Sequence, residues 1–215
     1  FFGFDKKNDI YAENVESKGL AGTVFTAVTP KGKMRLRVNV PGHHMVSNAL
    51  AAVAIGLELG LDEKQIAAGV AAFKPVSGHS SIVETDRFTI MDDCYNANPV
   101  STKAGLDVLA EAEERKVAIL GDMFELGSDE RKLHYEVGEY AADKGIDCIV
   151  CAGELAKEYY DGAKAAGKTE GLYYFATRDE AVDRLENIVK ENDAILVKAS
   201  HGMKFEKIVE VLKQM

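Results

Sequence analysis

Residues 90–101, IMDDCYNANPVS, place two acids and two asparagines between an apolar run and the start of a helical pattern. Adjacent carboxylates such as Asp92 and Asp93 can bind the hydroxyls of a ribose or a magnesium ion, and they can equally cap the turn through Asx-type hydrogen bonds. Asn96 and Asn98 allow similar alternatives, because NANP is ordinary turn composition. The residue types alone leave both interpretations open.

A second polar stretch, residues 120–134, offers Asp122, Glu125 and His134. Asp122 follows a glycine at the end of an apolar run, which is a common position for a carboxylate that faces a ligand. A lone histidine on a helix is more often a packing or surface residue than a catalyst, so His134 keeps both interpretations. Lys198 ends another apolar run, where a cation can meet a carboxylate or a phosphate, or remain solvated.

A third segment, PGHHMVSNALAA at residues 41–52, places His43, His44 and Asn48 at the start of an alanine-rich helix. Helix N-termini attract anions because their first N–H groups lack partners. Adjacent histidines rarely converge on one metal ion without further ligands, so packing or contact with a nucleotide is the better interpretation. We predict no metal site.

The elements that position these segments follow from hydrophobic periodicity. Beyond residue 80, short apolar runs without alternation are separated by helical stripes, a pattern typical of a parallel sheet covered on both faces in an open α/β domain. The expected strands are residues 88–91, 117–120, 148–152, 172–176 and 194–199. The expected helical stripes are Leu133, Val137, Tyr140 and Ala141; Ala181, Leu185, Ile188 and Val189; and Phe205, Ile208, Val209 and Leu212. Such sheets bind ligands beyond the carboxyl ends of their strands, where the polar stretches lie.

Upstream, residues 21–40 predict a hairpin with a turn at PKGK. Two helices follow, the second with a possible capping box of Asp62 and Gln65. Residues 74–81, KPVSGHSS, interrupt the periodicity and predict a linker. We therefore expect two domains, at residues 1–76 and 77–215.

Composition narrows the classes of function. With 215 residues, 47% hydrophobic content and a net charge of −9, the chain can bury a core and is a poor match for general nucleic-acid binding. No run approaches about 18 apolar residues, so we expect no membrane contact and a cytoplasmic location. Cys148 and Cys151 lie in an expected buried strand, where their spacing puts them on opposite faces, so we expect no redox pair. Phosphate-loop, dinucleotide and nucleophile-elbow motifs are absent.

Four segments, in their order and spacing, resemble the Mur ligase family. They are GHHMVSNALAA, DDCYNANPVS, LGDMFELG and LVKASHGMKFEKIV. The resemblance implies a Rossmann-like C-terminal domain with a mostly parallel sheet, preceded by the end of a central ATP-binding domain. It also implies that the family's phosphate loop and magnesium ligands lie upstream of Phe1, so that the chain is a fragment without activity of its own.

The activity implied by the resemblance is that of an ATP-dependent peptide ligase of peptidoglycan synthesis. ATP would phosphorylate the carboxylate of UDP-N-acetylmuramoyl-tripeptide, and the amine of D-alanyl-D-alanine would attack the resulting acyl phosphate. We expect ATP and Mg²⁺ as cofactors and a monomeric protein. One rival is a noncatalytic α/β module that binds a small ligand or a protein. Another is a folate-polyglutamate type of ligase, against which YNANP and LGDMFELG argue.

Residue by residue, the resemblance assigns three groups of positions. The expected catalytic residues are Asn96, Asn98, His134 and Lys198. The expected nucleotide-binding residues are His44 and Asn48 near the adenine, His79 near the phosphates and Asp93 at the ribose. The expected substrate-binding residues are Ser101, Asp122, Glu125, Ser200 and His201.

The chain departs from the family pattern at four positions. His79 and His201 stand where the family has arginine, Met45 replaces an asparagine, and Ala199 replaces a glycine. A histidine reaches less far than an arginine and is mostly neutral near pH 7. Either the two histidines keep weaker phosphate contacts, or phosphate binding depends on other residues.

Overall fold

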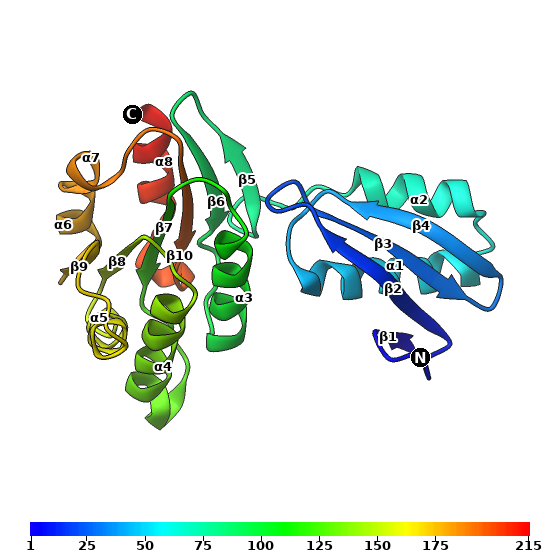
Figure 1. Ribbon diagram of the computed structural model, residues 1–215, viewed down its shortest axis with the longest axis horizontal. Coiled ribbons are helices and arrows are strands. Elements are labelled where there is room, and N and C mark those ends of the chain that lie inside the picture. The colour runs from blue at the N-terminus through cyan, green and yellow to red at the C-terminus, as the bar shows by residue number, and fades with distance from the viewer. The chain divides into compact units, whose positions relative to one another are not determined.

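A computed structural model describes residues 1–215, which form two compact units, Phe1–Pro75 and Val76–Met215 (Figure 1). The boundary between them falls inside residues 74–81, where proline and glycine interrupt the helical pattern. Each unit buries a hydrophobic core of its own.

The first unit, blue to cyan in Figure 1, contains a four-stranded sheet in the order β1-β2-β3-β4. The strands are β1 (Phe2–Gly3), β2 (Ile10–Ser17), β3 (Thr23–Thr29) and β4 (Gly32–Val38). The expected hairpin is confirmed as β3 and β4, whereas β1 and β2 were not expected. A bulge between Glu13 and Glu16 shifts the register of β2 against β3, with Asn14 at a φ of 52°. This bulge interrupts the period-2 pattern by which the strand could have been recognised.

Two helices, α1 (His43–Glu58) and α2 (Glu63–Ala72), pack against this sheet. Leu50 of α1 is fully buried in the shared core. The predicted capping box of α2 is confirmed. The Asp62 side chain accepts a hydrogen bond from the Gln65 N–H at 2.8 Å, and the Gln65 side chain accepts one from the Asp62 N–H at 2.9 Å.

The second unit contains a six-stranded sheet in the order β5-β6-β10-β7-β8-β9. The strands are β5 (Ser81–Glu84), β6 (Phe88–Asp93), β7 (Lys116–Gly121), β8 (Cys148–Ala152), β9 (Leu172–Phe175) and β10 (Asp193–Lys198). Neighbouring strands are parallel except β5 and β6. The mostly parallel α/β fold and its five expected strands are confirmed. The additional strand β5 is a partly exposed edge strand, so it lacks the apolar run that marks the others.

Helices cover both faces of this sheet (Figure 1). On one face lie α3 (Pro99–Ala110), α4 (Glu130–Asp143) and α5 (Ala156–Ala165). On the other lie α6 (Arg178–Val182), α7 (Leu185–Ile188) and α8 (Glu206–Gln214). Cys148 belongs to the core beneath α6 to α8 and Cys151 does not, and both are free and buried, which agrees with the expected opposite faces.

Two of the predicted helical stripes need correction. The buried side of α4 consists of His134, Val137, Gly138 and Ala141. Leu133 and Tyr140 are only partly buried. His134 and Gly138 lie on the buried side instead, and the prediction missed them because it considered only apolar residues. The stripe at residues 181–189 is divided between α6 and α7, although its side chains are buried as expected.

The position of β10 determines which loops meet at the carboxyl edge of the sheet. This strand is last in the chain but lies between β6 and β7. The loops after β6 and β7 lead to α3 and α4 on one face, whereas the loop after β10 leads to α8 on the other. Loops that diverge in this way mark the usual ligand site of an open α/β sheet.

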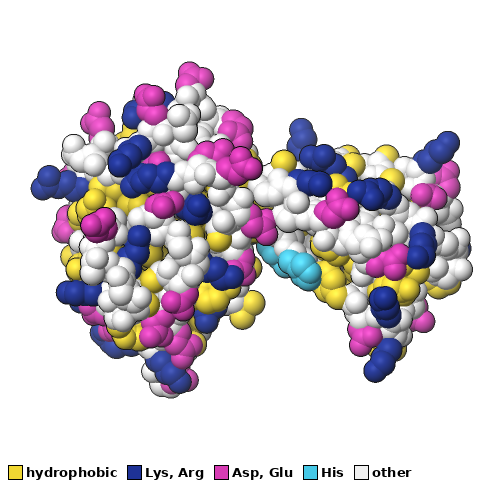
Figure 2. Space-filling view, in the orientation of Figure 1, with side chains coloured by type: hydrophobic (Ala, Val, Ile, Leu, Met, Phe, Trp, Pro, Cys, Tyr) yellow, Lys and Arg dark blue, Asp and Glu magenta, His cyan; other side chains and the backbone are white.

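Acidic and basic side chains are interspersed over the face shown in Figure 2, without a large area of one sign. None of the helices combines the length and the apolar character needed to cross a membrane.

Candidate functional site

The carboxyl ends of β6, β7 and β10 bring the predicted polar segments to one edge of the second unit. Lys198 at the end of β10 is in register with Asp93 of β6 and with Leu120 of β7. We call this edge the rim and define it as residues 92–101, 122–125 and 198–203, together with His79 and His134, which contact these segments. The rim gathers segments that lie up to about a hundred residues apart in the chain.

Lys198 and Asp93 form an ion pair in which Lys198 is buried and Asp93 is partly exposed. The Lys198 Nζ donates to Asp93 Oδ2 at 2.5 Å and to the backbone oxygen of Asn96 at 3.0 Å, and Lys198 is only 2% exposed. Asp93 Oδ1 accepts from the N–H and the hydroxyl of Ser80 at 2.9 and 3.0 Å. A carboxylate oxygen has two lone pairs, so Asp93 Oδ2 retains one acceptor direction for a ligand hydroxyl. Lys198 itself is placed to hold Asp93 and the following loop.

Asp92 binds the linker to the end of β6 through hydrogen bonds. Its Oδ2 accepts from the Ser77 hydroxyl and from the Gly78 N–H, both at 2.9 Å, and its Oδ1 accepts from the Cys94 thiol at 3.0 Å. Burial, assisted by the bond to Asp92, raises the pKa of the Cys94 thiol, so this group remains a donor. Asp92 therefore neither faces a ligand nor caps the turn before α3, and it bonds the linker instead.

Tyr95 lies between two histidines on the exposed side of the rim. Its ring centroid is 4.3 Å from that of His79 and 5.1 Å from that of His201. The Tyr95 N–H also donates to the Gly78 oxygen at 3.0 Å. Tyr95 therefore connects the linker with the loop after β10. The sequence interpretation missed this residue, and its place inside YNANP was the available signal.

The start of α3 uses two of the predicted site residues as a cap. Asn98 Oδ1 accepts from the Ser101 N–H at 2.9 Å, and the Ser101 hydroxyl accepts from the Asn98 N–H at 3.2 Å. Asn96 differs, because its Oδ1 accepts only from the neighbouring Ala97 N–H at 2.8 Å and its amide nitrogen has no partner in the chain. Asn96 is exposed and can donate to a ligand.

Asp122 and His134 are the buried polar side chains near the end of β7. Asp122 Oδ1 accepts from the Ala156 N–H at 2.7 Å at the start of α5, and burial raises the pKa of this carboxyl. His134 Nε2 accepts from the Met123 N–H at 2.8 Å, while its Nδ1 lies 2.7 Å from the Glu130 oxygen and therefore carries the proton. Burial lowers the pKa of His134 and favours the neutral imidazole. Both side chains are placed to support the end of β7.

Ser200 joins the loop after β10 to the loop after β7. Its N–H donates to the Asp122 oxygen at 3.0 Å, and its hydroxyl accepts from the Phe124 N–H at 2.8 Å. Glu125 follows in the left-handed region, with a φ of 63°. Its exposed carboxylate makes no hydrogen bond within the chain. A residue held in this sparsely populated conformation at a rim is a candidate for ligand contact.

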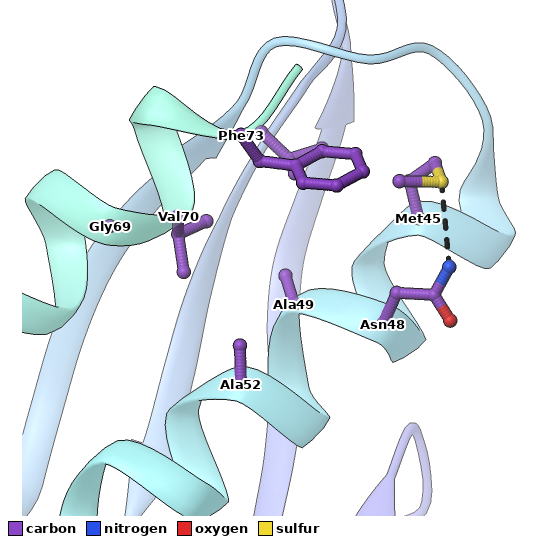
Figure 3. A pocket seen from close by; sticks show the side chains of 8 residues that line it. Met45, Asn48, Ala49, Ala52, Gly69, Val70 and Phe73 are labelled. Carbon is purple, nitrogen blue, oxygen red and sulfur yellow. Dashed lines mark hydrogen bonds between the residues drawn. The ribbon is translucent and has the colours of Figure 1, made fainter. Parts of the chain in front are cut away.

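The first unit contains a separate pocket of about 330 Å³ between α1, α2 and β4. Its apolar lining consists of Val38, Met45, Ala49, Ala52, Gly69, Val70 and Phe73. The polar lining residue is Asn48, whose Nδ2 donates to Met45 Sδ at 3.5 Å (Figure 3). In the same view the ring of Phe73 points toward Met45. His44 is exposed on the first turn of α1 and is not a lining residue.

The predicted site residues of the second unit thus fall into two kinds. Those used mainly within the chain are Asp93, Ser101, Asp122, His134, Lys198 and Ser200. Those with exposed side chains are His79, Asn96, Asn98, Glu125 and His201, and Tyr95 joins them. They offer amide donors, two imidazoles and a carboxylate at one edge, which suits the binding of a charged ligand. No three His, Cys, Asp or Glu side chains converge in a way that could hold a metal ion.

Two family models match the chain. The model described as "Mur ligase, glutamate ligase domain" matches residues 80–201. The model described as "Mur ligase middle domain" matches residues 1–56.

Curated relatives and solved structures agree with these matches. The UDP-N-acetylmuramoyl-tripeptide--D-alanyl-D-alanine ligase of Escherichia coli is 35% identical over 196 residues, which cover 90% of this chain and 42% of that protein. The enzyme of the same name from Mycobacterium tuberculosis is 37% identical and covers 89% of this chain and 39% of that protein. The crystal structure of MurF from Acinetobacter baumannii superposes with a TM-score of 0.88 at 29% identity, covering 100% of this chain and 46% of that one. The chain spans less than half the length of each.

Proposed function

Because the chain belongs to the Mur ligase family, we propose that it forms part of a ligase that joins UDP-N-acetylmuramoyl-tripeptide to D-alanyl-D-alanine in peptidoglycan precursor synthesis. The observation that carries this proposal is the match to relatives named for that reaction over 90% of the chain. Since the chain spans 42% of the same relative, we assign it a share of the binding sites within a longer protein. The first unit would be the end of a central ATP-binding domain, and the second unit the C-terminal domain.

The reaction needs activation because a free carboxylate resists attack by an amine. ATP supplies the phosphoryl group that turns the tripeptide carboxylate into an acyl phosphate. The pocket beside Asn48 suits a nucleobase, since it is apolar and carries an amide at its edge. We assign His44 to the same nucleotide and the remaining acceptor direction of Asp93 to a ribose hydroxyl.

The exposed rim residues would contact the reacting groups. The Asn96 amide can donate to an oxygen on which negative charge develops, and the imidazoles of His79 and His201 can donate to phosphate oxygens. The Glu125 carboxylate can hold the amino group of the dipeptide and keep it near the acyl carbon.

The buried rim residues would act by holding these groups in place. We assign positioning roles to Lys198 and His134, which were expected to be catalytic, because their polar atoms are already bonded within the chain. The substrate-binding assignments of Ser101, Asp122 and Ser200 change in the same way. Asn98 is exposed and uses its Oδ1 to cap α3, so its catalytic role stays a prediction. Mg²⁺ ligands are assigned to the rest of the ligase, since no cluster in this chain fits the ion. Monomeric state and cytoplasmic location stay predictions.

The experiment that tests this function measures phosphate release by the full-length protein. The assay contains ATP, Mg²⁺, UDP-N-acetylmuramoyl-tripeptide and D-alanyl-D-alanine, and each is omitted in turn. We expect release only when all are present. Absence of release under every condition would contradict the ligase and favour the noncatalytic binding module.

A further inference from the structure

We propose that Asp92 is a positioning residue that holds the linker segment Ser77–Ser80 on the second unit and thereby places the imidazole of His79 against Tyr95. The proposal deepens the function given above, in which His79 contacts the nucleotide. Its structural part concerns hydrogen bonds within this chain and can be tested without that function.

The linker segment is bonded to the end of β6 along its whole length. Asp92 accepts from the Ser77 hydroxyl and the Gly78 N–H, each at 2.9 Å. Asp93 accepts from the N–H and the hydroxyl of Ser80. The Gly78 oxygen in turn accepts from the Tyr95 N–H at 3.0 Å. Asp92 and Asp93 at the end of β6 and Tyr95 in the loop after it therefore all bind the segment through hydrogen bonds.

Asp92 depends on these donors because no cation accompanies it. The residue is 3% exposed, and its carboxylate is bonded to two groups of the linker and to the Cys94 thiol. A buried carboxylate without such donors is strongly unfavourable. Release of the linker would therefore leave a poorly compensated charge, and the segment stays with the second unit.

Between the two units, the backbone can therefore change its conformation only in the residues before Ser77. Phe73–Val76 contains no helix or strand, and Val76 is 73% exposed. Pro75 restricts its own φ and the conformation of Lys74, which leaves few rotatable bonds. His79 lies beyond this stretch and so moves with the second unit.

The two histidines that flank Tyr95 distinguish a specific role of Asp92 from a general loosening of the rim. His79 reaches Tyr95 from the linker that Asp92 holds, whereas His201 reaches it from the loop after β10. Loss of Asp92 should free His79 and leave His201 in place. General loosening of the rim would free both.

The test uses NMR of the 215-residue chain and of its Asp92→Ala variant. We expect amide exchange at Gly78 to become about tenfold faster or more, as for loss of a hydrogen bond to a charged acceptor. The ring protons of His79 should shift toward the values of a histidine without an aromatic neighbour, while those of His201 stay unchanged. Ser77→Ala, which removes one donor without touching the core, should shift the same signals by less.

Asp86→Ala, in the exposed turn before β6, is the matched control and should change none of these signals. Unchanged Gly78 and His79 in Asp92→Ala would overturn the proposal, and so would equal shifts of His79 and His201. In the full-length protein, Asp92→Ala should raise KM for ATP about tenfold with kcat within about threefold. If the unsubstituted full-length protein has no ligase activity, the proposed function fails while the NMR result still decides the role of Asp92.

Discussion

At the scale of single residues, the polar side chains of the rim differ in burial. The buried ones stabilise the loops of the rim, and the exposed ones can contact a ligand. Asp122, His134 and Lys198 are each at most 5% exposed, and each is bonded to a backbone group of a loop or helix end. Removing such a partner leaves a buried group unsatisfied, at a cost of about 1–3 kcal/mol. Asn96 bonds only the adjacent Ala97 N–H and is exposed, so its substitution should affect ligand binding more than stability.

The first residue-scale prediction concerns the pH dependence of stability. Burial holds the pKa of His134 below its ordinary value of 6.5, so the folded state binds fewer protons than the unfolded state between these two values. The contribution of His134 is intact above pH 6.5 and is lost as the pH falls through that window. In His134→Gln, urea unfolding should give a free energy that declines less steeply as the pH falls below 6.5.

The same variant should lose about 1–3 kcal/mol at pH 7 if the Met123 N–H is left without a good acceptor. His43→Gln, in the first unit, serves as control and should leave the unfolding of the second unit unchanged at every pH. A slope identical to that of the wild type would contradict the assigned neutral imidazole.

The second residue-scale prediction concerns Asn96→Ala in the full-length protein. We expect substrate-dependent phosphate release to fall about 100-fold, as for loss of one donor to developing charge. The melting temperature should stay close to that of the wild type. Glu113→Ala, which lies exposed before β7 at the opposite edge of the sheet, should retain activity. Wild-type activity in Asn96→Ala would remove Asn96 from the reaction centre.

At the scale of elements, α4 and α5 pack closely because each presents a glycine to the backbone of the other. A Cβ on Gly138 would lie 2.1 Å from the Tyr159 oxygen, and one on Gly162 would lie 2.1 Å from the Tyr135 oxygen. Backbone atoms cannot move aside as a flexible side chain can. This contact keeps α4 in place, and α4 carries His134 to the end of β7.

Gly138→Ala should therefore destabilise the second unit by about 3 kcal/mol, because overpacking forces the two helices apart. Gly69→Ala in α2 is the matched control, since nothing lies within 4 Å of the added carbon. That change should stabilise the first unit by about 0.4–1 kcal/mol. Chemical denaturation, followed separately for each unit, measures both effects, and an unchanged Gly138→Ala protein would refute the close packing.

At the scale of the whole molecule, the chain consists of two units with separate cores and a linker of which only the first part is free. Val76 is exposed, whereas Ser77 to Ser80 are bonded to the second unit. Proteases cut preferentially at exposed segments without secondary structure.

Brief digestion with elastase or proteinase K should consequently cut first within residues 73–76. Mass spectrometry should detect two resistant pieces that correspond to the two units. Trypsin should spare this site, because Lys74 precedes a proline. First cuts within residues 77–80 would contradict the view that hydrogen bonds to Asp92 and Asp93 hold this part of the linker in place.

The sequence by itself determined the α/β class of the second unit, the hairpin β3–β4, the capping box of Asp62 and the family. These features depend on local patterns, because an apolar run or stripe reports that a face is buried and a turn or cap involves residues close in the chain. The same patterns missed β2, where a bulge interrupts the alternation, and misassigned the buried side of α4, where His134 and Gly138 replace apolar residues.

Only the tertiary structure decided how the rim is built. Strand order places β10 between β6 and β7, which brings Lys198 to Asp93 across 105 residues and His201 to Tyr95. Periodicity shows that a residue is buried but not which distant element covers it, so it cannot separate a buried support such as Asp122 from an exposed contact such as Asn96. That distinction arises from packing between elements far apart in the chain.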